Sequence, residues 1–151
     1  MRTQVAIDIH IHIADVWQEV SDLTSHVTWM HDAKEIRLRS AQHEGVGTEI
    51  ECLTQVGLLS TVDILRVTSW KPRESITMEH LGSVKGTGTL SLKAFGSTTH
   101  VTWTETVYFP WWAGGSVTGA VAKPILHEIW ASNLQHLKRK CEEKYRTAQS
   151  K

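Results

Sequence analysis

Residues 114–145 read GGSVTGAVAKPILHEIWASNLQHLKRKCEEKY and predict one long C-terminal helix. At about 100° per residue, six mostly apolar positions fall along one line of that helix, with His127 and Asn133 on its shoulders. Charged side chains lie mainly off the line, so one side of the helix faces water and the other must be covered. The positions along the line are Lys123, Leu126, Trp130, Leu134, Leu137 and Cys141.

The chain before this helix alternates between apolar and polar residues in the manner of β-strands. Residues 5–13, VAIDIHIHI, place five apolar side chains on one face of a first strand. Two short helices are expected next, at 14–20 with Asp15 as its N-cap and at about 25–30. Six further strands are expected at 34–39, 48–56, 59–70, 75–81, 87–95 and 99–109.

This order of elements predicts an antiparallel sheet, because its last six strands follow one another through short turns. One helix with a single apolar line can lie in the concave side of such a sheet when the sheet is bent. We therefore expect an α+β fold, with a seven-stranded antiparallel curved sheet and two short helices wrapped around a long C-terminal helix. With no repeat or linker in the sequence, residues 1–151 should form a single domain.

Several short motifs occur in a particular order along the chain. They are Val16-Trp17, Ser21-Asp22, Thr28-Trp29, Gly45-Val46-Gly47-Thr48, residues 67–72 and residues 96–104, GSTTHVTWT. Their order resembles the polyketide cyclase/dehydrase and lipid-transport family of the START/Bet v 1-like (SRPBCC, helix-grip) superfamily. The resemblance covers nearly the whole chain and implies a deep cavity between the long helix and the sheet. Members of the superfamily include aromatase/cyclases, carriers of lipids, sterols and quinones, and hormone receptors.

Composition excludes several kinds of partner. The chain has 16 Lys and Arg against 16 Asp and Glu, so no broad basic field is present for nucleic acid or an anionic membrane. No apolar run approaches the ~20 residues of a membrane span, and the N-terminus MRTQVAID has no signal-peptide pattern. We expect a cytoplasmic monomer or homodimer with no integral membrane association.

The sequence contains no signature of a cofactor or metal site. Nucleotide-binding glycine patterns and the G-x-S-x-G motif are absent, so no cofactor is expected. Asp8, His10 and His12 share one face of the first strand, but that face should be the solvated one, and no metal site is expected. Cys52 and Cys141 lack metal-ligand spacing and are expected to be free buried thiols.

A cavity also follows from packing, because one helix cannot fill the concave side of a sheet seven strands wide. Seven tryptophans in 151 residues exceed what a small core needs. Polar groups on the inward faces would either line the cavity or bond one another. The expected lining residues are Trp29, Met30, Cys52, Met78, His80, Leu90, Trp103, Trp111, Trp112, Trp130 and Asn133.

Glu105 is the leading candidate for catalysis, because it lies two residues past Trp103 on the apolar face of the last strand. Burial there would raise the pKa of its carboxyl and suit it to general acid or base chemistry. His127 or His26 could transfer protons beside it. The alternatives are that Glu105 lines the cavity without catalysis, or that it has a structural role and pairs with Lys123 or His127.

Trp111 and Trp112 lie in a loop bounded by proline and glycine before the long helix. Adjacent exposed indoles are costly unless they cover an apolar opening or meet a partner. They would form a gate for an apolar ligand, pack under the loop, or bind another molecule.

These features predict a protein that binds a hydrophobic, aromatic or polycyclic small molecule in its cavity. A cofactor-independent polyketide cyclase/aromatase, of lyase or isomerase type, would act by positioning and proton transfer. The alternatives are a non-catalytic lipid or quinone carrier, and a protein-interaction module that uses the Trp111-Trp112 rim.

Overall fold

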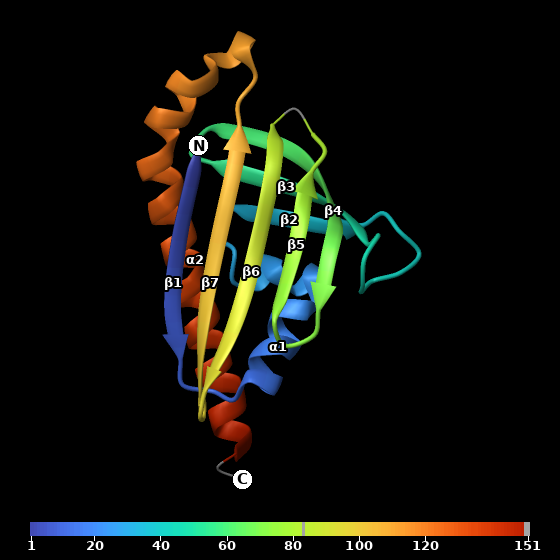
Figure 1. The fold of residues 1–151 in the computed structure, drawn as a ribbon, viewed down its shortest axis with the longest axis vertical. Coiled ribbons are helices and arrows are strands. Elements are labelled where there is room, and N and C mark those ends of the chain that lie inside the picture. The colour runs from blue at the N-terminus through green and yellow to red at the C-terminus, as the bar shows by residue number, and fades with distance from the viewer. Residues whose placement is uncertain (83, 150–151) are drawn as a thin grey trace.

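The computed structural model describes residues 1–82 and 84–149, and it has the expected architecture of one curved antiparallel sheet with a long helix (Figure 1). The sheet strands are β1 (Arg2–Ile9), β2 (Ala33–Leu38), β3 (Glu49–Val56), β4 (Leu59–Lys71), β5 (Ser75–His80), β6 (Lys85–Phe95) and β7 (Thr98–Tyr108). The helices are α1 (Ile13–Ser21), η1 (Leu23–Thr28), η2 (Trp111–Ala113) and α2 (Gly115–Gln149), where η denotes a 3₁₀-helix.

The seven strands are ordered β1-β7-β6-β5-β4-β3-β2, and every neighbouring pair is antiparallel. Strands β2 to β7 are therefore sequential neighbours, and only β1 is brought to the sheet from a distant part of the chain. A register shift between Val67 and Ser69 interrupts the pairing of β4 with β5. Such irregularities bend a strand, and β2 and β3 lie across the sheet behind β5 and β6 (Figure 1).

Helix α2 covers only one side of the concave face. Its sheet neighbours are chiefly β1 and, to a lesser extent, β7. The expected apolar line of the helix is confirmed over its C-terminal part, where Trp130, Leu134, Leu137 and Cys141 are buried. Lys123, which the spacing placed on the same line, is exposed. Helix α2 therefore leaves the concave side of β3 to β6 uncovered.

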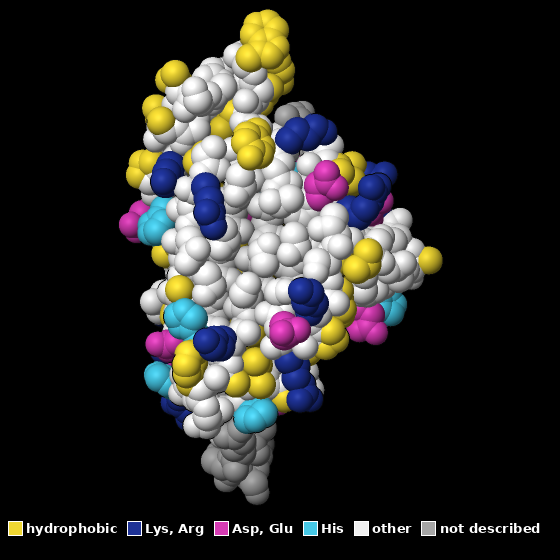
Figure 2. Space-filling model, in the orientation of Figure 1, with side chains coloured by type: hydrophobic (Ala, Val, Ile, Leu, Met, Phe, Trp, Pro, Cys, Tyr) yellow, Lys and Arg dark blue, Asp and Glu magenta, His cyan; other side chains and the backbone are white. Residues whose placement is uncertain are grey.

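The N-terminal part of α2 has an uncovered apolar face. Val117, Val121 and Ile125 recur every four residues, and their exposed fractions are 70%, 66% and 53%. Trp111 and Trp112 in η2 are 88% and 68% exposed at the same end. Figure 2 shows hydrophobic side chains gathered at the upper end of the molecule. We call these five residues the apolar tip.

The first strand is shorter than expected. Residues 5–13 alternate throughout, but β1 ends at Ile9. The helix α1 begins at Ile13, and its N-cap is His12 rather than Asp15, because the His12 ring accepts a hydrogen bond from the Ala14 amide at 3.2 Å. Capping competes with strand extension here, since it satisfies a helix N–H group that would otherwise lack a partner.

A buried carboxylate joins α1 to the end of α2. Glu19 is 3% exposed and lies 2.7 Å from the ammonium groups of both Lys140 and Lys144. The Tyr145 hydroxyl also donates to it at 3.0 Å. Burial alone would raise the pKa of Glu19, but these three partners lower it. Helix α1 is thus fixed against α2 at the end of the molecule opposite the apolar tip (Figure 1).

We predict that Leu137→Ala reduces the free energy of unfolding by about 2 to 5 kcal/mol, the usual cost of a cavity at a fully buried leucine. Val121→Ala, on the exposed part of the same helix, should change it by less than about 0.5 kcal/mol. Urea denaturation of the two variants measures both values. Equal effects would contradict the assignment of the buried face of α2.

Candidate functional site

The concave side of the sheet contains a cavity made of two adjoining chambers. The larger has a volume of about 220 Å³ and the smaller about 80 Å³. They adjoin because five residues line both: Met30, Cys52, Leu65, Trp103 and Glu105. The cavity lies beside α2 and under β3 to β7, and α2 leaves β3 to β6 of this region uncovered.

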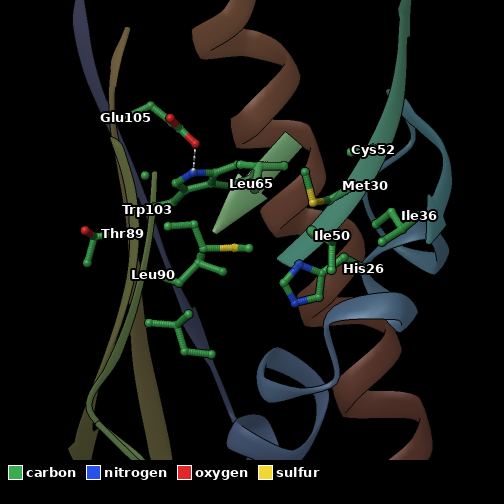
Figure 3. Close-up of a pocket in the computed structure, with 13 residues that line it drawn as sticks. His26, Met30, Ile36, Ile50, Cys52, Leu65, Thr89, Leu90, Trp103 and Glu105 are labelled. Atoms are coloured by element: carbon green, nitrogen blue, oxygen red, sulfur yellow. Dashed lines mark hydrogen bonds between the residues drawn. The ribbon is translucent and has the colours of Figure 1, made fainter. Parts of the chain in front are cut away.

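The smaller chamber is almost entirely apolar. It is closed by the strand centres and by η1, and Figure 3 shows side chains from both sides pointing into it. Besides the shared residues, it is lined by His26, Ile36, Ile50, Ile76, Met78, Gly88, Thr89 and Leu90.

The larger chamber is more polar and lies at one end of the sheet. Val56 ends β3, Val84 precedes β6 and Phe109 follows β7, so these three residues lie at the same end of the strands. Trp130 and Leu126 of α2 form its helical side. Its remaining lining residues are Asp32, Thr54, Thr61, Val62, Asp63, His80 and Val107.

Three ionisable side chains form a hydrogen-bonded chain across the larger chamber. His80 Nδ1 lies 2.5 Å from Asp63 Oδ2, and His80 Nε2 lies 3.0 Å from Glu105 Oε2. The other Glu105 oxygen accepts a hydrogen bond from the Trp103 indole nitrogen at 3.1 Å. Glu105 is 6% exposed, and it lines both chambers. Its side chain therefore faces the cavity as expected, and it is held by two donors.

The glycines of β6 leave room for the hydrogen bonds that link Asp63, His80 and Glu105. His80 belongs to β5 and Glu105 to β7, so β6 lies between them in the sheet. Gly86 pairs with His80, and Gly88 pairs with Glu105. A Cβ atom at Gly88 would collide with the Glu105 carboxylate, and one at Gly86 would collide with the Thr106 carbonyl. The missing side chains leave a gap through which His80 reaches Glu105.

The two carboxylates keep His80 charged. Burial by itself would lower the pKa of His80, but the hydrogen bonds and charges of Asp63 and Glu105 raise it to about 10. At neutral pH the group is an imidazolium between two carboxylates, and each of its N–H groups has an acceptor.

His26 lines the smaller chamber in the opposite state. Burial lowers its pKa to about 4, against the weaker opposing effect of a hydrogen bond to the Val20 carbonyl. Since a carbonyl only accepts, His26 Nε2 carries the proton that it donates over 2.7 Å. The ring also lies against Trp29, with 4.8 Å between ring centroids. His26 is therefore a neutral cavity residue that is anchored to the backbone.

His127 is not part of the cavity, and the expectation that it works beside Glu105 is wrong. It is exposed on α2, and its Nδ1 lies 2.9 Å from the Thr3 hydroxyl of β1. On α2, His127 faces the edge strand β1, whereas the cavity lies on the other side of Trp130. Lys123 is likewise exposed, and Glu105 pairs with His80 instead of either residue.

The expected lining residues divide into two groups. Met30, Cys52, Met78, His80, Leu90, Trp103 and Trp130 do line the cavity. Trp29 does not, because it is fully buried behind Trp103 at 6.2 Å between ring centroids. Asn133 is also buried outside the cavity, where it accepts from the His31 amide and donates to Asp32.

Trp111 and Trp112 do not line the cavity either. Both belong to the apolar tip and are exposed, so neither closes the opening or packs beneath the loop in this structure. The expectation that they line the cavity is wrong, because η2 holds both indoles on the outside of the molecule.

Sequence reasoning missed Asp63 and Asp32. Asp63 lies in β4, where the sequence does not alternate cleanly between apolar and polar residues and so indicated no inward face. The available signal was the pattern of glycines at 82, 86 and 88. A Cβ at Gly82 would collide with Asp63, just as one at Gly88 would collide with Glu105. Paired glycines beside acidic strand positions therefore indicated space reserved for carboxylates.

Cys52 and Cys141 are both free and buried, as expected. Burial raises the pKa of the Cys52 thiol and raises that of Cys141 to about 12. Among the residues that the structure describes, no cluster of three or more His, Cys, Asp or Glu side chains is arranged to hold a metal ion. In the same part of the chain, no helix is both long and apolar enough to cross a membrane.

The curved sheet, the long helix and the cavity between them define a helix-grip protein of the START/Bet v 1-like class. Residues 1–142 match the family model described as polyketide cyclase / dehydrase and lipid transport, and the chain belongs to this family. No curated protein shows a significant sequence match to it.

Solved structures with the same fold include two aromatase/cyclases. The ZhuI aromatase/cyclase from Streptomyces sp. R1128 aligns with a TM-score of 0.78 and 12% identity, over 98% of this chain and 97% of that one. The di-domain aromatase/cyclase StfQ of the steffimycin biosynthetic pathway aligns with 0.78 and 11%, over 95% of this chain and 51% of that one. TTHA0849 from Thermus thermophilus aligns with 0.80 and 13%, over 95% and 99%. At such identities the similarity establishes the fold alone.

We predict opposite titrations for the two cavity histidines. His80 should remain protonated through pH 8, and Asp63→Asn should lower its midpoint from about 10 toward 6.5. The contribution of His80 to stability is complete below pH 6.5 and is lost as pH rises through 10, because the folded pKa is raised.

His26 should remain neutral down to about pH 5, and its contribution to stability is lost as pH falls toward 4, because the folded pKa is lowered. NMR of the imidazole carbons measures both midpoints, and coincident titration near pH 6.5 would contradict the geometry.

We predict that Gly88→Ala displaces the Glu105 carboxylate, because the added methyl group needs the space that the carboxylate occupies. The Trp103 indole N–H signal should shift, and the pKa of His80 should fall as it loses contact with Glu105. Thr87→Ala, on the exposed side of the same strand, is the matched control and should leave both unchanged. An unaltered indole signal in Gly88→Ala would show that β6 does not need its glycine.

Proposed function

We propose that the protein binds a hydrophobic, aromatic or polycyclic small molecule in the two-chamber cavity. The observation that carries this proposal is an apolar interior of about 220 and 80 Å³ in place of a solid core. For comparison, an engineered apolar cavity of about 150 Å³ binds benzene. Membership of a family described by cyclases, dehydrases and lipid transport supports the same class of ligand.

Within that role, we propose a cofactor-independent cyclase/aromatase reaction with Glu105 as the proton-transferring group. Each oxygen of a carboxylate has two acceptor positions, and Trp103 and His80 occupy one on each oxygen of Glu105. The remaining positions can accept a proton from an acidic carbon between two ketones. The resulting enolate attacks a further carbonyl carbon, and the new alkoxide takes the proton back from Glu105.

His80 is a positioning residue in this proposal, because both of its N–H groups are already bonded. Its imidazolium balances Glu105 before the proton moves and holds the carboxylate toward the chamber. Positioning of this kind contributes to rate by keeping the base within reach of the substrate. His26 is neutral and bonded to the backbone, so it contributes shape to the smaller chamber.

A non-catalytic carrier of a lipid or quinone is the second candidate. The observation in its favour is the apolar tip, which lies at the same end of the molecule as Phe109 and the larger chamber. An exposed apolar surface near a binding cavity suits delivery of a ligand to another apolar surface. A protein-interaction module using Trp111 and Trp112 rests on the same exposed residues.

The experiment that tests these proposals begins with native mass spectrometry of the purified protein. We expect a co-purifying apolar compound at one molecule per chain. When the protein is titrated with that compound, tryptophan fluorescence should be quenched saturably, and Trp103→Ala should lose most of the response. Trp112→Ala, whose indole is exposed, should keep it. Quenching that depends only on Trp111 and Trp112 would instead favour the interaction module.

The Glu105→Gln variant distinguishes the proposed enzyme from the proposed carrier. If Glu105 transfers the proton, the variant should lose turnover by about 10²-fold or more, whereas its affinity should change by no more than the roughly tenfold that one charge-assisted hydrogen bond supplies. Product formation at the wild-type rate would remove Glu105 from the mechanism and leave the carrier as the better account.

A further inference from the structure

The cavity lining contains more negatively charged groups than positively charged ones. Asp32, Asp63 and Glu105 are carboxylates of the larger chamber, and His80 is the cationic group among its described lining residues. Among the described residues that line either chamber, none is Lys or Arg. His26 is neutral, and burial raises the pKa of the Cys52 thiol, so neither offsets the imbalance. The lining therefore has an excess of negative charge.

The imidazolium of His80 cannot serve as an anion-binding group. Its two ring nitrogens lie 2.5 Å from Asp63 and 3.0 Å from Glu105, so both N–H groups are already used. An anionic ligand would have to displace a carboxylate from it while being repelled by the other two. Because the site is partly buried, that repulsion is screened less than it would be on the surface.

Hydrogen-bond acceptors, in contrast, are available to a ligand. Glu105 has acceptor positions beyond those used by Trp103 and His80. The Asp32 carboxylate accepts a hydrogen bond from the Asn133 amide at 2.7 Å, and it also lines the larger chamber. Hydrogen bonds to charged acceptors are about twice as strong as neutral ones. A neutral hydroxyl on an otherwise apolar ligand fits this lining best.

We propose that the cavity selects an apolar ring compound that carries a neutral hydrogen-bond donor, a phenol or enol hydroxyl, and that it excludes carboxylates. The donor end lies in the larger chamber at Glu105, and the apolar part extends past Trp103 toward Leu90 in the smaller chamber (Figure 3). This inference rests on the proposed binding of hydrophobic molecules and specifies the ligand's polar group.

Three naphthalene derivatives test it, because they share one ring system and differ only in the polar group. 2-Naphthol donates a hydrogen bond, 2-methoxynaphthalene only accepts, and 2-naphthoate is anionic near neutral pH. Calorimetry with the full chain should give the tightest dissociation constant for 2-naphthol. The other two should bind about tenfold more weakly or worse, the factor expected for one charge-assisted hydrogen bond.

Two cavity variants and one surface control test which carboxylate produces the preference for the hydroxyl group and the exclusion of the anion. Glu105→Gln should reduce the advantage of 2-naphthol over 2-methoxynaphthalene and improve binding of 2-naphthoate. Asp32→Asn should improve 2-naphthoate while largely keeping the preference for the hydroxyl. Glu51→Gln removes a carboxylate from the outer face of β3, where it is not part of either chamber, and should change neither ratio.

The possible outcomes separate this inference from the proposed function. Equal binding of 2-naphthol and 2-naphthoate, or of 2-naphthol and 2-methoxynaphthalene, would overturn the inference while leaving a hydrophobic binding cavity. No binding of any probe to the folded protein would overturn both. A preference for 2-naphthol that is as strong in Glu105→Gln as in the wild type would overturn the assignment of Glu105 as the group that receives the hydroxyl.

Discussion

A single helix set against a seven-stranded sheet is the constraint on which the rest of this structure depends. Helix α2 packs chiefly on β1 and β7, so its apolar side chains cannot reach the concave faces of β3 to β6. Protein interiors are normally filled to the density of organic crystals. Here η1 and the strands' own side chains close part of the space, and the remainder is the two-chamber cavity.

The polar groups of that interior can be buried because they satisfy one another. Asp63, His80 and Glu105 come from β4, β5 and β7, and the glycines of β6 allow them to meet. Removing His80 would leave two buried carboxylates without the cation that they share, which is costlier than an apolar interior. A structural role for Glu105 is therefore compatible with the proton transfer proposed for it. The contacts that make its burial tolerable also direct it toward the cavity.

The sequence predicted the architecture well because period-two alternation in strands and the helical period in α2 are local patterns. Those patterns also put Trp103 and Glu105 on the inward face correctly. They failed where tertiary packing decided the outcome. The helical period placed His127 close to the line of Trp130, but that side of α2 faces β1, where His127 contacts Thr3. Asp63 became important only through neighbours that sequence spacing does not reveal, on strands that meet across a pair of glycines.

The two cysteines differ in whether their sulfur atoms face the cavity. Cys52 lines both chambers, whereas Cys141 is sealed between α2 and the rest of the core. An electrophilic compound in the larger chamber would therefore meet the Cys52 sulfur and not the Cys141 sulfur, and the raised pKa of Cys52 would make this reaction slow. Covalent capture would mark a defined point on β3, and occupancy of the interior by a second molecule would shield that same atom.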